Sequence, residues 1–180
     1  YGYFKKNMLN IYNKDKYNMN LYLGNKKEDQ TTNEFKKYVN KAINITSMDD
    51  IEVINLVRND KIDILFDLMG LTSNHRLSLY KNRLAPIQIS WCGYLNTTGL
   101  KEMDYMIADR NIVPQEEQNL YSEKIIYLDD IWNCHAGYEL KRSKYTIPFR
   151  QNKFITFGSF NNFNKINDSV IAVWSKILKK

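Results

Sequence analysis

The stretch Ile62–Met69 (IDILFDLM) is a nearly continuous apolar run that is closed by Gly70. The run is far too short to span a membrane and has the usual length of a strand. Because it lacks a regular alternation of apolar and polar residues, it indicates a strand covered on both faces, as strands of parallel sheets are. This run therefore predicts a parallel α/β sheet.

Short strands and helices alternate on both sides of this run. Strands are predicted at 17–23, 86–91, 105–108 and 125–128, and helices at 3–13, 31–42 and about 47–59. The last helix follows a capping-box-like pattern of Ser47 and Asp50. Alternation of this kind is typical of a parallel sheet with crossover helices. The predicted fold class is α/β with a Rossmann-like parallel sheet.

The pattern changes after residue 128. Residues 129–152 lack periodicity and carry Gly137, Pro148 and a basic cluster, whereas FITFG at 154–158 predicts a fresh strand and a helix follows from about Asp168. We therefore expect an N-terminal domain at 1–140, truncated at its start, an interdomain connection at 141–153 and the beginning of a C-terminal domain at 154–180. Because the last helix has a large apolar face without cover, we expect an internal segment of a longer polypeptide.

Composition excludes several classes. Seven Gly and three Pro argue against low complexity, and no apolar stretch is long enough for a membrane span or a secretory signal, so we expect a cytoplasmic protein. Two Cys and two His in no ligand spacing predict no metal site. The net charge of +6 comes from scattered Lys without a recognisable nucleic-acid-binding motif, so no nucleic-acid partner is predicted.

Three loops that follow predicted strands contain the residues best suited to bind a ligand, because ligands of parallel sheets lie beyond the carboxyl ends of the strands. They are Gly70–Arg76, Cys92–Gly99 and Ser159–Lys165. The third precedes a helix N-terminus, where backbone N–H groups, the helix dipole and Lys165 favour an anion. Taken singly, each loop is more often an ordinary turn. Asp63 and Asp67 share one side of their strand, and either a base or a structural role is open for them.

Arg83–Gly99 (RLAPIQISWCGYLNTTG) and Met103–Asp109 (MDYMIAD) resemble the R-P-A-P-[IV]-Q-x-x-W-x-G-Y-P-G-T-[ST]-G and M-D-Y-x-I-x-D runs of the O-linked N-acetylglucosamine (O-GlcNAc) transferase family, SPINDLY-like proteins included. Similar runs are Asp60–Gly70, Tyr121–Lys124 and Phe157–Ile166. The resemblance is close over 60–180 and extends to 1–59 only by pattern.

The resemblance implies a glycosyltransferase of the GT-B type, which binds a UDP-sugar between two Rossmann-like domains and commonly carries tetratricopeptide repeats upstream. It implies transfer of a sugar, N-acetylglucosamine first of all, to Ser or Thr hydroxyls of a protein acceptor, with no metal or other cofactor. Lys165 matches the family lysine that contacts the nucleotide diphosphate. Asn162 matches a neighbouring position that contacts the nucleotide in the family. Gly93, Tyr94, Thr97 and Thr98 lie on the loop that matches the one lining the sugar side in the family. Thr72, on the first loop, is a further donor-binding candidate.

The chain departs from the family pattern at Leu84 and Leu95, which replace prolines, and at Asn96, which replaces a glycine. A different sugar donor or acceptor is therefore an alternative, and a non-catalytic scaffold domain of a tetratricopeptide-repeat protein is another. Asp63 occupies the position of a family histidine once proposed as a base, so no general base is named. We expect the 180-residue segment to be inactive by itself.

Overall fold

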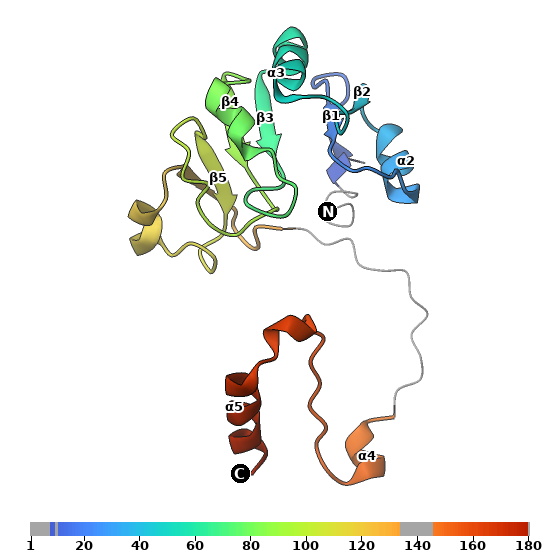
Figure 1. The fold of residues 1–180 in the computed structure, drawn as a ribbon, viewed down its shortest axis with the longest axis vertical. Helices are drawn as coiled ribbons and strands as arrows, with labels where there is room; N and C mark the ends of the chain where they lie inside the picture. The colour runs from blue at the N-terminus through green and yellow to red at the C-terminus, as the bar shows by residue number, and fades with distance from the viewer. Residues whose placement is uncertain (1–7, 10, 134–145, 180) are drawn as a thin grey trace. The chain divides into compact units, whose positions relative to one another are not determined.

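The computed structural model describes residues 8–9, 11–133 and 146–179 (Figure 1). The chain divides into two compact units, Tyr1–Tyr138 and Glu139–Lys180, which are described separately below. Within the described residues, no helix combines the length and apolarity needed to cross a bilayer.

The first unit alternates strands with helical segments. Its strands are β1 (Asn20–Leu23), β2 (Lys41–Asn44), β3 (Ile64–Asp67), β4 (Ile87–Ser90), β5 (Tyr105–Ala108) and β6 (Lys124–Tyr127). Its helices are α2 (Gln30–Lys36) and α3 (Asp50–Asn59), with 3-10 turns η1 (Leu77–Asn82) and η2 (Gln115–Leu120). Strands β1 and β2 form one pair and β3-β4-β5-β6 form a second sheet in that order, and every pairing is parallel. The predicted α/β fold with parallel sheets is confirmed.

Helix α3 shows how local sequence and core packing combine. It begins with a capping box in which the Asp49 carboxylate accepts from the Glu52 N–H (2.8 Å) and the Glu52 carboxylate accepts from the Asp49 N–H (2.8 Å). One face of the helix places Val53 and Val57 in the core beside Leu65 of β3. The capping box was predicted two residues too early, at Ser47 and Asp50, because both pairs have the same three-residue spacing.

In the part of the chain that the structure describes, only one face of β3 is covered, contrary to the prediction of a strand buried on both faces. Leu65 and Asp67 are buried, whereas Ile64 and Phe66 are 45% and 42% exposed. Ile87, paired with Ile64 in the adjacent strand, is also exposed. Val53 and Val57 of α3 and Leu79 of η1 share the core with Leu65. An apolar run by itself therefore does not show how many faces of a strand are covered.

The predicted helix at 31–42 is also wrong in its second half. Helix α2 ends at Lys36, and residues from Lys41 form β2, which pairs with β1 in the register Leu21↔Ala42. The apolar residues of β2 continued the helical spacing by coincidence. At the chain start, Met8, Leu9 and Ile11 are helical, and most of the predicted helix at 3–13 lies outside the described residues.

The second unit contains α4 (Pro148–Asn152), the 3-10 turn η3 (Phe163–Lys165) and α5 (Asp168–Leu178). Helix α5 begins where the sequence predicts it, with the Asn167 side chain accepting from the Val170 N–H (3.1 Å). Residues 154–158 are not a strand, contrary to prediction. A strand is held by hydrogen bonds to a neighbouring strand, and the described part of the second unit contains none. Helix α4 also interrupts 129–152, which was predicted to be irregular throughout; residues 134–145 lie outside the described residues.

Truncation of the buried and the exposed residue of β3 should have unequal effects. We expect Leu65→Ala to lower the free energy of unfolding of the 180-residue chain by about 2–5 kcal/mol, because it leaves a cavity in the core. Ile64→Ala, the matched control on the exposed face, should cost less than half as much. Urea denaturation followed by circular dichroism measures both, and equal losses would contradict the one-sided cover of β3.

Candidate functional site

The carboxyl end of β3 is organised by a buried carboxylate. Asp67, 5% exposed, accepts from the Met69 N–H (3.1 Å) through Oδ1 and from the Gly70 N–H (2.8 Å) through Oδ2. Its carbonyl oxygen accepts from the Trp91 N–H (2.9 Å), at the end of β4. Asp67 therefore shapes the turn that leaves β3 and ties it to the next strand.

Two glycines allow the loops after β3 and β4 to meet. A Cβ atom on Gly93 would lie 2.2 Å from the carbonyl oxygen of Leu68, and one on Gly70 would lie 2.4 Å from Cβ of Tyr94. Gly70 also has a φ of +54°, which favours glycine. We call Asp67–Thr72 and Trp91–Tyr94 the paired loops. Three of the predicted site residues, Gly93, Tyr94 and Thr72, belong to them, and the Thr72 hydroxyl donates to the Met69 carbonyl (2.7 Å).

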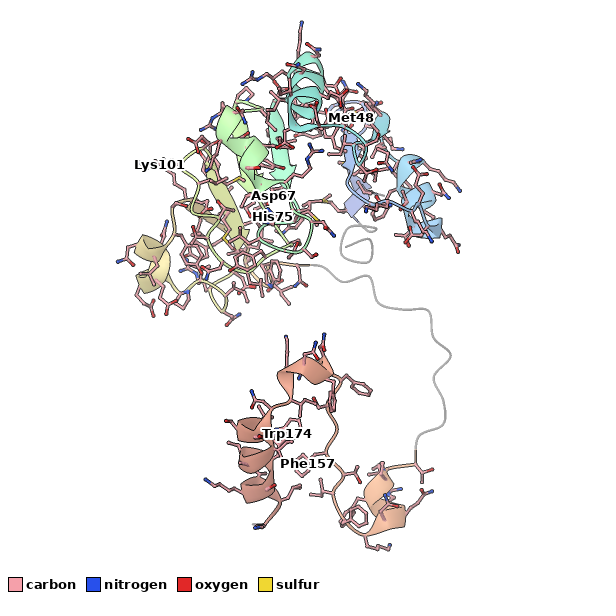
Figure 2. The ribbon with its side chains drawn as sticks, viewed as in Figure 1. Met48, Asp67, His75, Lys101, Phe157 and Trp174 are labelled. Atoms are coloured by element: carbon pink, nitrogen blue, oxygen red, sulfur yellow. The ribbon has the colours of Figure 1, made fainter. Side chains whose placement is uncertain are left out.

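The surroundings of the paired loops shift the pKa of Asp67, and hydrogen bonds hold the nearby side chains of His75 and Arg76 in place. Burial raises the pKa of Asp67, against the lowering effects of its two N–H donors and of the nearby His75 (Figure 2). His75 Nδ1 accepts from the Leu77 N–H (3.3 Å). Arg76 pairs with Asp50 and donates to the carbonyls of Ile45 and Met48, so it joins the loop to the start of α3.

Thr97 and Thr98 lie elsewhere on the same β4–β5 connection, beside the residue that immediately precedes β6. Thr97 Oγ1 donates to Glu123 Oε2 (2.7 Å), and both the N–H (2.7 Å) and the hydroxyl of Thr98 donate to Oε1. Glu123 is 3% exposed. The structure therefore brings Thr97 and Thr98 to the amino end of β6, whereas Gly93 and Tyr94 lie at the carboxyl ends of β3 and β4.

A second buried carboxylate, Asp109, organises the end of β5. Its Oδ1 accepts from the Asn111 (2.8 Å) and Ile112 (3.1 Å) N–H groups, and its Oδ2 accepts from the Trp132 N–H (2.7 Å). These bonds, the one from Trp132 foremost, lower the pKa of Asp109. The Trp132 carbonyl in turn accepts from the Trp91 indole (2.7 Å).

Residues beyond the predicted set thus hold the loops. Glu123 and Asp109 stand in the Y-S-E-K and M-D-Y-x-I-x-D runs and were available as motif residues. The partners of Glu123 and the Trp132 partner of Asp109 lie too far away in the sequence to be recognised. Buried Gln88 is a third case, since its amide donates to the Tyr80 (3.0 Å) and Glu102 (2.7 Å) carbonyls.

In the second unit, Asn162 caps the start of the turn η3, and Lys165 is the last residue of that turn. The Asn162 side chain accepts from the Asn164 N–H (3.0 Å), and its carbonyl accepts from the Lys165 N–H (2.9 Å). Lys165 is exposed and has no ion pair among the described residues. It lies just before the N-terminus of α5, as the anion-site prediction requires. No cluster of His, Cys, Asp or Glu suited to a metal is found in the described parts of either unit.

A side chain at Gly93 should be far less tolerable than one at a glycine with free space around it. We expect Gly93→Ala to destabilise the chain by about 2 kcal/mol or more, because the methyl group would overlap the Leu68 backbone. Gly24→Ala is the control, since no heavy atom lies within 4 Å of its added Cβ. Thermal unfolding measures the difference, and an equally small effect at both glycines would refute the close loop contact.

Asp67 should make unfolding depend on pH with a sign opposite to that of Asp109. Because its folded pKa is raised, the stability that Asp67 contributes is complete below its unfolded pKa of about 3.9 and is lost as the pH rises through the folded pKa. We therefore expect the free energy of unfolding of the wild type, relative to Asp67→Asn, to fall as the pH rises above about 4.

For Asp109, whose pKa is lowered, the contribution is present above the unfolded pKa and is lost as the pH falls through the folded value. The wild type should therefore lose stability relative to Asp109→Asn below about pH 4. Urea denaturation across this pH range tests both, and a flat difference for Asp67→Asn would show that its carboxyl titrates normally.

The chain is similar to known proteins in both sequence and structure. The model of glycosyl transferase family 41 matches residues 5–137. A protein from Oryza sativa subsp. japonica named as a probable UDP-N-acetylglucosamine–peptide N-acetylglucosaminyltransferase SPINDLY is 38% identical over 98% of this chain and 20% of its own length. A probable enzyme of the same activity named SEC, from Arabidopsis thaliana, is 30% identical over 77% of this chain and 15% of its own length.

A solved structure, a mutant of the Thermobaculum terrenum O-GlcNAc transferase, superposes with a TM-score of 0.87 at 30% identity, covering 98% of this chain and 33% of that one. The chain thus spans about a fifth of the length of the first of these curated relatives. Parallel α/β architecture, this structural match and the match over residues 5–137 agree, and the chain belongs to glycosyl transferase family 41.

Proposed function

We propose that the protein containing this chain transfers N-acetylglucosamine from UDP-N-acetylglucosamine to Ser or Thr hydroxyls of protein acceptors. The observation that carries the proposal is similarity over 98% of the chain to proteins named as UDP-N-acetylglucosamine–peptide N-acetylglucosaminyltransferases. In this proposal, 1–140 belong to the first GT-B domain, 141–153 connect the domains and 154–180 begin the second. Upstream tetratricopeptide repeats, a cytoplasmic location and independence of metals and other cofactors belong to the same proposal.

The paired loops supply the sugar side of the donor site. They lie at the carboxyl ends of β3 and β4, where ligands of parallel sheets bind. Gly93 lets the β4 loop pack against the Leu68 backbone, which places Tyr94 beside Gly70, and Tyr94 and Thr72 supply hydroxyl oxygens. Thr97 and Thr98 support the same loop through Glu123.

Asn162 and Lys165 supply the diphosphate side. In the reaction, the bond between the anomeric carbon and the β-phosphate oxygen breaks, and UDP leaves with the electron pair. A bond forms from the same carbon to the acceptor oxygen, which loses its proton. Negative charge therefore grows on the diphosphate, where the exposed ammonium group of Lys165 and the N-terminus of α5 stabilise it.

The second candidate function is transfer of a different sugar from a different donor. The sequence of the loop after Tyr94 supports this candidate. Leu95 and Asn96 replace the proline and glycine of the family pattern, directly after Tyr94. A changed loop can change which sugar fits, while the diphosphate contacts stay the same. The donor test must therefore include sugars other than N-acetylglucosamine.

Thermal protection of the full-length protein tests donor identity. UDP, UDP-N-acetylglucosamine, UDP-N-acetylgalactosamine, UDP-glucose and GDP-fucose are compared at equal concentrations, because a ligand that binds the native state raises the unfolding temperature according to its Kd. We expect the greatest protection by UDP-N-acetylglucosamine, followed by its transfer to an acceptor peptide in a mass-spectrometric assay. Protection by GDP-fucose alone would replace the donor, and protection by none of the five would favour a non-catalytic scaffold.

Loss of the Lys165 charge should abolish most of the transfer. We expect Lys165→Ala in the full-length protein to lower kcat by about 100-fold or more, since one preorganised positive group facing the leaving charge is worth that much. Lys176→Ala, an exposed lysine in the last turn of α5, is the matched control and should retain wild-type turnover. Unchanged kcat in Lys165→Ala at saturating donor would rule out its role at the diphosphate.

A further inference from the structure

Glu123 is a buried carboxylate that, among the described residues, accepts side-chain hydrogen bonds from one loop. Its two oxygens accept from Thr97 Oγ1, from the Thr98 N–H and from the Thr98 hydroxyl. It is 3% exposed, and no ion pair to it occurs in the described parts of the chain. The charge is therefore held entirely by directional hydroxyl and amide donors, which makes the position of the loop sensitive to the carboxylate.

At its other end, the same loop is held by the close contact of Gly93 with the Leu68 backbone. Gly93 presses against the Leu68 backbone, and a few residues later Thr97 and Thr98 are held by Glu123. Thr97 Oγ1 also accepts from the Gly99 N–H (3.1 Å) and the Ser122 N–H (3.2 Å). The segment that contains Tyr94 is thus held at two places. The Gly93 contact lies at the carboxyl ends of the strands, and the Glu123 hydrogen bonds lie at the amino end of β6.

We propose that Glu123 is a positioning residue for the sugar side of the donor site, which it controls through Thr97 and Thr98 without touching the donor. This inference rests on the proposed function, because it takes Gly93 and Tyr94 as the sugar-facing part of the site. Its consequence is specific: a loosened loop weakens contacts to the sugar and leaves the contacts of Asn162 and Lys165 to the nucleotide diphosphate unchanged.

This consequence separates a positioning role from a merely structural one. A variant that only unfolds more easily reduces the fraction of protein able to bind, and it affects UDP and the UDP-sugar equally. A variant in which the loop moves raises the Kd of the UDP-sugar selectively. The ratio of the two dissociation constants is therefore the informative quantity.

The experiment is calorimetric titration of the full-length protein with UDP and with UDP-N-acetylglucosamine. In Glu123→Gln, we expect the Kd of the UDP-sugar to rise about three- to tenfold, the range of one or two weakened hydrogen bonds, and that of UDP to change less than about twofold. Asp29→Asn is the matched control, because Asp29 likewise accepts from the N–H (2.7 Å) and the hydroxyl (2.8 Å) of one threonine, Thr32. It should change neither constant by more than about twofold.

Thr98→Val provides a second test that keeps the carboxylate and removes one donor. It should shift the same ratio in the same direction, and the Glu123→Gln, Thr98→Val double variant should shift it no further than the larger single effect. A wild-type ratio in both single variants, or additive effects in the double variant, would overturn the positioning role while leaving the donor assignment intact. A wild type that binds UDP without any preference for its sugar conjugates would instead overturn the proposed function, and the inference with it.

Discussion

The close contact of Gly93 with the Leu68 backbone is the constraint on which the candidate site depends. Any side chain at this position would place a carbon 2.2 Å from a carbonyl oxygen that cannot move without moving the end of β3. The contact brings the β3 and β4 loops together and determines where Tyr94 lies. Asp67 completes the arrangement, because it holds the Met69 and Gly70 N–H groups on the other side of the same junction.

The sequence was informative where a local signal coincided with the global fold. Residues of β5 and the start of α5 were predicted correctly: a short apolar run indicated β5, and the structure shows that Asn167 caps α5 where the helix was expected to begin. The predicted strand at 154–158 failed for a physical reason: its apolar residues fit a strand, but a strand also needs a partner, which composition cannot reveal. Strand β2 was missed because its residues continued the spacing of the preceding helix.

The candidate site could be predicted only as a set of residue types on loops. Gly93 and Tyr94 lie where an α/β site is expected, because they directly follow β4 and the carboxyl ends of parallel strands meet at one edge. Thr97 and Thr98 follow on the same β4–β5 connection. At these residues the connection has already reached the amino end of the sheet, beside Glu123. Their hydroxyls looked available in the sequence because Glu123, their partner, is separated from them by the whole of β5.

Three acidic residues of the motif runs are poorly placed to act as a general base. Asp67, Asp109 and Glu123 are each buried, and each uses both carboxylate oxygens to accept from backbone N–H or hydroxyl groups of a loop. A general base must have a lone pair facing the proton that it removes, whereas these lone pairs face the protein's own donors. In this chain, carboxylates that would suggest acid–base chemistry in a sequence instead fix the loops, so the shape of the candidate site depends on buried acidic side chains that are occupied by the protein's own donors.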